Sequence, residues 1–206
     1  MLTRKKVSMP ILNIMNLRSN GDYMISLSLQ LALNCAPVFM GQAVANTVAL
    51  SREEADRIPL IFKNNDVSYR FLCEISGKQI VYFYRKEALY SYLNKEESLD
   101  LLREYGYEKG CDFLDVLSSR IKEYTGGMIG YPHEIGLFLG YPVSDVRSFI
   151  RYKGENYKIT GYWKVYHNES HARKKFRIFD ECREIAVNEL IGGKKIINII
   201  QRQEVI

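Results

Sequence analysis

Gly130-Tyr-Pro-His-Glu-Ile-Gly-Leu-Phe-Leu-Gly-Tyr-Pro142 is the stretch that decides how the second half of this chain folds. Its tripeptide Gly-Tyr-Pro stands at 130–132 and again at 140–142. Proline is tolerated in the first turn of a helix, because its missing N–H would have had no partner there. Glycine is typical just after a helix, and Ser144-Asp145 of a helix start. The pattern predicts two short helices that meet at a tight corner and present apolar side chains to a core, namely Ile135, Phe138, Leu139, Val146, Phe149 and Ile150.

The segment after the corner reads as a strand followed by a long helix. Residues 158–166 alternate with the period of a β-strand. One predicted face carries Tyr157, Ile159, Gly161, Trp163 and Val165, and the other carries Lys158, Thr160, Tyr162, Lys164 and Tyr166. Asn168 is then placed to cap an amphipathic helix that ends at Gly192-Gly193. The apolar stripe of that helix is Ala172, Phe176, Phe179, Ala186 and Leu190.

Upstream of the corner, the clearest local signal is a β-hairpin. Residues 67–75 and 79–84 are rich in β-branched and aromatic side chains and flank the turn Ser76-Gly77-Lys78. Ser51-Arg-Glu-Glu54 has the pattern of a capping box that opens a helix. Residues 25–33 fit a strand or a helix almost equally, and Pro37 is expected to break that element. Further helices are predicted over 86–94, 97–105 and 112–124.

The composition is that of an ordinary soluble globular protein. The chain has 206 residues, of which 47% are hydrophobic and 26% charged, enough for one domain with a substantial core. No Pro/Ser-rich linker divides it. We therefore predict a single α+β domain over 23–191, with a small, mostly antiparallel sheet covered by several helices. A poorly specified lead-in over 1–22 would precede it, and a tail over 192–206 would follow.

Charge and cysteine usage bear on the class of function. From Arg147 onward there are 13 Lys/Arg against 7 Asp/Glu. This basic C-terminal third of the chain could bind nucleic acid, an anionic ligand or an acidic partner. The alternative is that its charges form the solvated face of a helix. The four cysteines are scattered without a Cys-x-x-Cys, which fits the reduced thiols of a cytoplasmic protein. Residues 24–51 lack charge, but polar groups run through them, so we interpret them as a buried element and expect no membrane contact.

The central motif, His133-Glu-Ile-Gly-Leu-Phe-Leu-Gly-Tyr-Pro142, resembles a clostridial family known as domain of unknown function family 3793. The similarity extends over roughly residues 25–185 and includes Asp145-Val146, Phe149-Ile150, Gly161-Tyr-Trp-Lys-Val-Tyr166, Ala172, Phe176, Cys182-Arg183 and, as an N-terminal signature, Cys35-Ala-Pro37 with Gly41. The resemblance implies a cytosolic protein, mostly from anaerobic Firmicutes, with no established activity.

Two departures from that family bear on chemistry. Relatives commonly carry Cys where this chain has Ile159 and Tyr162, and Lys where it has Gln42. If those strand thiols bind metal or act in redox chemistry in relatives, this chain does not do so there.

The sharpest enzymatic hypothesis is a thiol–imidazole pair. Cys35 would be the nucleophile, His133 its base and Glu134 the group that orients a neighbour, because a cysteine nucleophile needs a base within hydrogen-bond reach. The alternative is a structural thiol and a histidine that only helps to cap a helix. For metal, His167 and His171 share a helix face with Cys182 further along, but no further carboxylate or cysteine pair completes a ligand set, so we predict no metal site. No phosphate-binding glycine motif is present, and the sequence names no cofactor.

Non-covalent binding is the leading hypothesis. We expect a binding or regulatory module for a small anionic or planar ligand or for a protein partner, with its ligand-binding residues at the corner and on the segment after it: Tyr131, His133, Glu134, Tyr141, Trp163 and Lys164. Lys164 would contact the anion, and aromatic rings would stack on the planar part. The alternatives are a small cysteine-dependent enzyme that uses Cys35 and His133, and a basic nucleic-acid-binding module.

Overall fold

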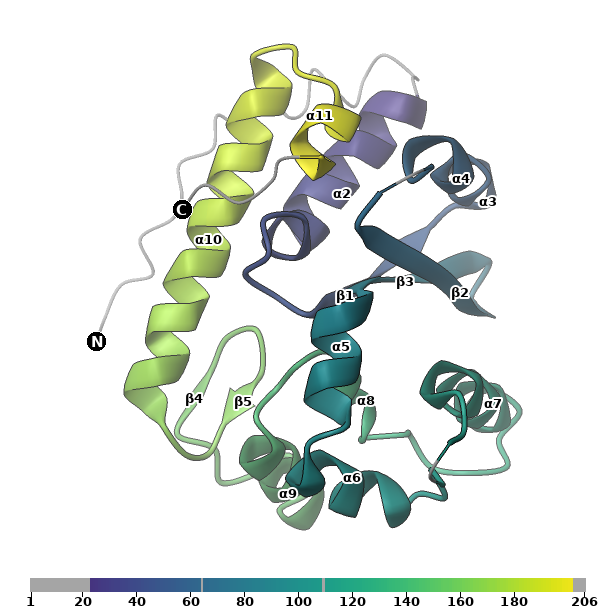
Figure 1. The fold of residues 1–206 in the computed structure, drawn as a ribbon, viewed down its shortest axis with the longest axis vertical. Helices are drawn as coiled ribbons and strands as arrows, with labels where there is room; N and C mark the ends of the chain where they lie inside the picture. Colours follow the sequence, from purple (N-terminus) through teal and green to yellow (C-terminus); the bar gives the residue numbers. More distant parts are fainter. Residues whose placement is uncertain (1–22, 64, 109, 202–206) are drawn as a thin grey trace.

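The computed structural model describes residues 23–63, 65–108 and 110–201. The lead-in expected over 1–22 and the last part of the expected tail, 202–206, lie outside the described residues. The described chain is a single α+β domain built around a small antiparallel sheet packed against helices, as predicted (Figure 1). None of the helices in this part of the chain has the length and apolar character needed to cross a membrane.

The sheet has three antiparallel strands in the order β1-β3-β2. They are β1 (Ala45–Leu50), β2 (Val67–Ile75) and β3 (Lys78–Arg85). The predicted β2–β3 hairpin is confirmed, and its tight turn places Ser76 at φ 51° and Gly77 at φ 75°. Turns with two positive φ angles match the right-handed twist of the flanking strands, which is why such a short loop closes this hairpin.

Alternation along the strands divides the core into two clusters. Val81 and Phe83 of β3 face one side, where they pack with α2 (Tyr23–Phe39), α3 (Arg52–Ala55), α4 (Ile58–Ile61), α10 (Glu169–Ile191) and α11 (Ile196–Ile200). Tyr82 of β3 faces the other side. That side is covered by α5 (Lys86–Leu93), α6 (Glu96–Arg103), α7 (Phe113–Thr125), α8 (Ile135–Phe138) and α9 (Val143–Arg151). In Figure 1 α2, α3, α4 and α11 lie in the upper part of the molecule and α6–α9 in the lower part, while α10 runs along the left side from the top to the level of β4.

Residues 23–39 form one helix, so the strand alternative for 25–33 and the predicted break at Pro37 are both wrong. Pro37 lies within the last turn of α2. Its carbonyl accepts hydrogen bonds from the amides of Gln42 and Ala43, and Arg85 donates from its guanidinium to the carbonyls of Val38 and Phe39. The carbonyls left free at this helix end are thus satisfied by the loop and by β3.

The predicted strand over 158–166 is also wrong. The structure has two two-residue strands, β4 (Ile159–Thr160) and β5 (Lys164–Val165), paired as a small antiparallel hairpin. The chain reverses at Gly161, where an added Cβ would overlap the ring of Phe176 on α10. Because the segment folds back on itself, the continuous exposed face expected from Lys158 to Tyr166 does not exist, and Tyr166 is buried.

Candidate functional site

The two short helices predicted from the Gly-Tyr-Pro repeat are present as α8 and α9 and form the floor of the candidate site. They pack closely because residue 136 is glycine: a Cβ there would lie 2.9 Å from Val146 Cγ2. Gly140 ends α8 with φ 74°, a conformation that other residues rarely adopt. Pro142 directly precedes α9, so the corner lies where the sequence places it.

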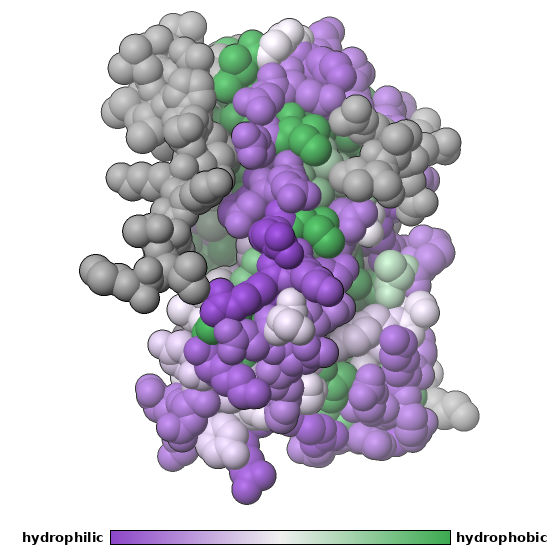
Figure 2. Space-filling model, turned by 90° about the vertical axis from the view of Figure 1, so that its left-hand side faces the viewer, coloured by the Kyte–Doolittle hydropathy of each residue, from purple (hydrophilic) through white to green (hydrophobic). Residues whose placement is uncertain are grey.

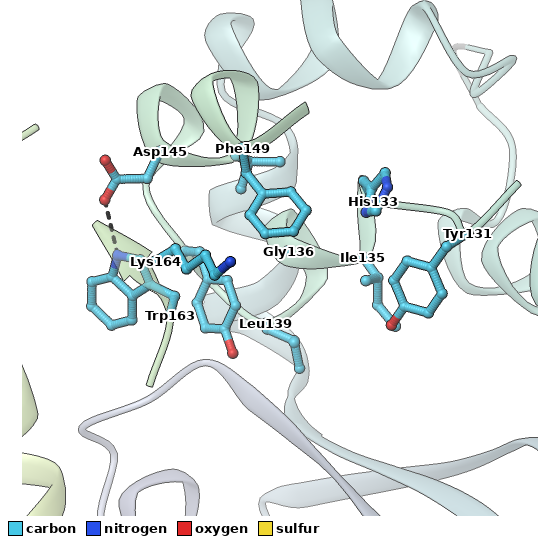
Figure 3. A pocket seen from close by; sticks show the side chains of 11 residues that line it. Tyr131, His133, Ile135, Gly136, Leu139, Asp145, Phe149, Trp163 and Lys164 are labelled. Atoms are coloured by element: carbon cyan, nitrogen blue, oxygen red, sulfur yellow. Dashed lines mark hydrogen bonds between the residues drawn. The ribbon is translucent and has the colours of Figure 1, made fainter. Parts of the chain in front are cut away.

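Asp145 fixes the β4–β5 hairpin to this corner. Its side chain is 4% exposed and accepts three hydrogen bonds. Oδ2 accepts from Trp163 Nε1 at 2.9 Å, and Oδ1 accepts from the backbone amides of Tyr166 and His167 at 2.9 and 3.0 Å. Both carboxylate oxygens are therefore engaged by N–H donors, and the indole of Trp163 is held at the edge of the corner (Figure 3).

A pocket of about 270 Å³ opens between the corner and the hairpin. Its walls are mainly aromatic. Tyr141 stacks on Trp163 with ring centroids 5.2 Å apart, and His133 lies against Phe149 at 5.1 Å. Figure 3 shows Tyr131 and His133 on one side of the pocket and Trp163 and Lys164 on the other, with Phe149 between them. We call this cavity the aromatic pocket.

Lys164 places a cation in this aromatic wall. Its ammonium donates to the carbonyl of Gly154 at 2.7 Å and lies 4.7 Å from the ring centre of Tyr157 and 5.8 Å from that of Phe149. No carboxylate among the described residues forms an ion pair with it. An ammonium has three donors, and only one of them is bonded here. The half-buried charge is thus available to a ligand.

The tyrosines of the pocket stay neutral at physiological pH. Burial raises the pKa of Tyr141 to about 12, and its hydroxyl donates to the carbonyl of Tyr162 at 3.1 Å. Burial also raises the pKa of Tyr131, which packs edge-on against Tyr124. These rings therefore offer apolar faces and hydroxyl groups rather than negative charge.

Five of the six ligand-binding residues expected from the sequence line this one pocket: Tyr131, His133, Tyr141, Trp163 and Lys164. Glu134 does not line it. Its side chain is fully buried beneath the corner, where Oε1 accepts from Arg120 Nε at 2.5 Å and from the Tyr107 hydroxyl at 3.4 Å. The neighbouring residues His133 and Glu134 therefore point to different surroundings.

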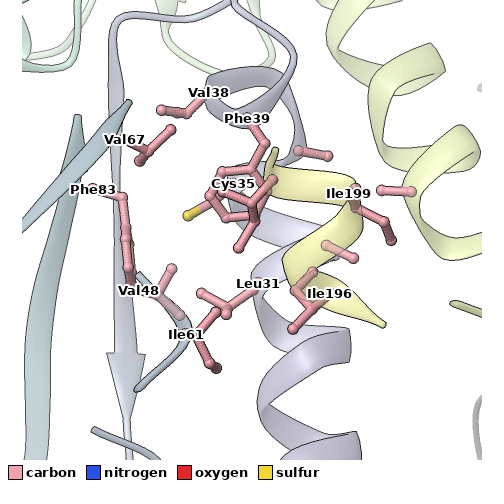
Figure 4. Packing of buried hydrophobic residues seen from close by; sticks show 14 of the residues in the cluster. Leu31, Cys35, Val38, Phe39, Val48, Ile61, Val67, Phe83, Ile196 and Ile199 are labelled. Atoms are coloured by element: carbon pink, nitrogen blue, oxygen red, sulfur yellow. The ribbon is translucent and has the colours of Figure 1, made fainter. Parts of the chain in front are cut away.

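Cys35 lies in the core on the α2 side of the sheet. It is fully buried among apolar side chains such as Leu31, Val48 and Phe83 (Figure 4). Burial raises the pKa of its thiol well above the usual range, only partly offset by the charge of Arg183. A protonated, enclosed thiol is a poor nucleophile. The structure does not place Cys35 in the lining of the pocket that holds His133.

The metal-ligand spacing noted in the sequence is not assembled into a site. His167 Nε2 lies 2.9 Å from the hydroxyl of Ser148. Within the residues that the structure describes, no three His, Cys, Asp or Glu side chains are grouped as metal ligands. All four cysteines are free.

Sequence reasoning missed part of the pocket. The sequence pattern indicates Asp145 only as part of a helix start and gives no signal for Gly136, because their partners Trp163 and Val146 are distant in sequence. The same pattern predicts core positions for the apolar residues Ile135, Leu139, Val146 and Phe149, whereas in the structure they also line the pocket. Their spacing is that of any helix packed on a core, so no sequence signal separates the two roles.

Comparison with known proteins identifies the family of the chain. Residues 31–200 match the family described as protein of unknown function, DUF3793. The match spans most of the chain, and the protein belongs to this family, as the resemblance of its central motif indicated. No curated protein and no solved structure shows significant similarity to it.

Proposed function

We propose that this member of the DUF3793 family is a binding protein whose aromatic pocket takes a small ligand with a planar body and an anionic group. The observation that carries the proposal is the ammonium of Lys164, which is half-buried among aromatic rings and has no carboxylate partner in the described part of the chain. A cation held in this way attracts an anion more strongly than an exposed lysine does, because less water screens it.

The rest of the pocket supports a planar ligand. A volume of about 270 Å³ lies near the lower end of the usual range for small-molecule sites, roughly 300–1,000 Å³. The stacked pair Tyr141–Trp163 and the ring of Phe149 offer flat apolar surfaces. Aromatic walls with few polar groups are what such sites generally use to bind and orient a ligand. Asp145 does not oppose an anion strongly, because three N–H donors already compensate its charge.

The test is a comparison of aromatic carboxylates with their uncharged amides, read by thermal shift and by the fluorescence of Trp163, the only tryptophan in the chain. We expect the acids to bind more tightly than the amides. Lys164→Gln should weaken binding of the acids about tenfold or more, since a hydrogen bond to a charged group contributes about 1.5–3 kcal/mol. It should leave binding of the amides nearly unchanged.

The matched control is Lys158→Gln. Lys158 is an exposed lysine next to the same hairpin and does not line the pocket. The Lys158→Gln variant should bind the acids with an affinity within about twofold of that of the wild type, because exposed charges are screened by water and salt. Equal affinity for acids and amides, or equal losses in the two lysine variants, would contradict the proposal.

A further inference from the structure

A second cavity lies between α10 and the corner, on the other side of Tyr141 and Trp163. It has a volume of about 110 Å³. His171 and Lys175 of α10 form one wall, the loop around Gln42 forms another, and Gly140 at the end of α8 closes it. We call it the rear cavity. His171 and Lys175 do not line the aromatic pocket described above.

Lys175 is a partly buried cation at the wall of this cavity. Its one hydrogen bond is a long one of 3.4 Å to the carbonyl of Gln42. The described residues provide it with no ion pair, whereas Arg173, two positions earlier on the same helix, pairs with Glu169. Lys175 is only partly exposed. Its ammonium therefore keeps donors free in a partly enclosed space.

His171 adds a second donor at the right place. It lies one helical turn before Lys175, and residues four apart on a helix share a face. Both side chains line the same cavity. The backbone N–H of His171 donates to the cap residue Asn168, but its imidazole makes no hydrogen bond or ion pair with the described residues and is exposed. The two side chains thus form a pair of N–H donors aimed at one small volume.

The size of the cavity limits what these donors can bind. One water molecule needs about 10–15 Å³ of such a cavity, so 110 Å³ leaves room for a tetrahedral oxyanion, although the cavity is smaller than the neighbouring aromatic pocket. Donors without a nearby carboxylate are the usual surroundings of a bound phosphate.

The surrounding surface is also positive. The same half of α10 carries Lys174 and Arg177, both exposed, in addition to Arg173. Figure 2 shows this side of the molecule as mostly hydrophilic in its described part, with only small separate apolar areas. Clustered positive charge raises the local concentration of anions and speeds their association.

We propose that the rear cavity is an oxyanion site that takes a phosphate group, either free or at the end of a larger molecule, with Lys175 and His171 as its donors. This inference goes beyond the aromatic pocket and does not depend on it, because the two cavities use different cations. They share the wall formed by Tyr141 and Trp163. Occupation of either cavity should therefore change the fluorescence of the single tryptophan, and variants show which cavity is responsible.

The experiment is a titration of the full chain with inorganic phosphate at constant ionic strength, read by Trp163 fluorescence and by thermal shift. Phosphate should produce a saturable change in Trp163 fluorescence and in melting temperature, and sodium chloride at the same ionic strength should not. Lys175→Gln should weaken phosphate binding about tenfold, the usual effect of losing a charge-assisted hydrogen bond. His171→Gln should weaken it by a smaller factor.

Two matched variants decide the interpretation. Lys174→Gln removes the same charge from the adjacent exposed position of α10 and should bind phosphate within about twofold of the wild type. Lys164→Gln should also leave phosphate binding intact, whatever it does to aromatic acids, so failure of one site is distinguishable from failure of the other. If Lys175→Gln does not fold, His171→Gln carries the same comparison, since His171 is exposed.

The source of the phosphate is separated by a second titration with phenyl phosphate. Binding at least as tight as that of inorganic phosphate, and weakened by Lys175→Gln, would assign the cavity to a phosphate monoester. Tighter binding of inorganic phosphate would assign it to the free ion. A phosphate effect no larger than that of chloride, or equal losses in Lys174→Gln and Lys175→Gln, would overturn the proposal.

Discussion

Asp145 shows how much of the site depends on a single side chain. One carboxylate joins the first turn of α9 to the indole of Trp163 and to two backbone amides that follow β5. Sequence patterns identify such a residue only as a helix-start residue, because its partners lie 18 to 22 positions away. The structure makes it the positioning residue of the aromatic pocket, since Trp163 is one of the pocket walls.

Asp145→Ala should therefore destabilise the protein and loosen Trp163. The substitution leaves three N–H donors without their acceptor, and a buried unsatisfied donor costs about 1–3 kcal/mol. We expect the free energy of unfolding to fall by about that amount, because water entering from the pocket compensates part of the loss. Urea unfolding measures the change, and acrylamide quenching of Trp163 in the folded state should increase.

The control for this variant is Asp100→Ala. Asp100 is exposed and forms an ion pair with Arg103 on its own helix. An exposed pair contributes roughly 0.2–1 kcal/mol, so this variant should change stability little and leave Trp163 quenching unaltered. Similar quenching in Asp145→Ala and in the wild type would show that the carboxylate does not position the indole.

At the scale of elements, the correct predictions are those with complete local signals. Asn168 and Asp112 accept hydrogen bonds from amides of the helices they precede, and Ser51 forms a full capping box with Glu54. Caps are recognisable because both partners lie within a few residues of each other. The short helices α8 and α9 were predictable for the same reason, from glycine and proline at their ends.

The predictions of elements that proved wrong concern segments whose structure is determined by contacts with residues distant in sequence. The alternation of side chains over 158–166 is the same whether these residues form one strand or the two arms of a hairpin. The hairpin is selected by the packing of Gly161 against Phe176 and by the hydrogen bond from Trp163 to Asp145. Pro37 is tolerated in the last turn of α2 because Arg183, far along the chain, donates from Nε to the carbonyl of Leu33, which the missing N–H of Pro37 leaves without its helical partner. In the site, the polar and aromatic residues were recognisable from their clustering, whereas its apolar walls were not.

A substitution in the β2–β3 turn should stabilise the protein. Ser76 has φ 51° and is followed by Gly77 at φ 75°. Asparagine adopts positive φ more readily than serine, and Asn-Gly is the preferred pair for such two-residue turns. Ser76→Asn should raise the melting temperature by about 1–2 °C, corresponding to about 0.5 kcal/mol. Ser76→Val, whose branched side chain disfavours positive φ, should lower it, and the reverse order would contradict the assigned turn.

At the scale of the whole molecule, the sheet separates two cores of different character. The cluster on the α2 side is formed by aliphatic and aromatic side chains and contains Cys35 and Cys182. The cluster on the α8–α9 side contains several tyrosines and supports the aromatic pocket. The pocket therefore rests on only one of the two cores. Substitutions deep in the other core should change stability without directly altering ligand contacts.

The buried thiol of Cys35 makes the stability of the whole domain sensitive to alkaline pH. Burial raises its pKa in the folded state, whereas in the unfolded chain a cysteine ionises near pH 8.5. The folded state then holds the proton while the unfolded state loses it. The contribution of Cys35 is fully present below about pH 8 and is lost as pH rises further, by about 1.4 kcal/mol for each pH unit above the unfolded pKa.

Cys35→Ala isolates this contribution, because other buried groups such as Cys182, whose pKa burial raises to about 11, act in the same direction in both proteins. Urea unfolding at pH 7, 8, 9 and 10 should give a constant difference between wild type and variant up to pH 8. The difference should then narrow by about 1.4 kcal/mol between pH 9 and 10. Parallel curves across the whole range would mean that the thiol ionises as readily in the folded protein as in the unfolded chain.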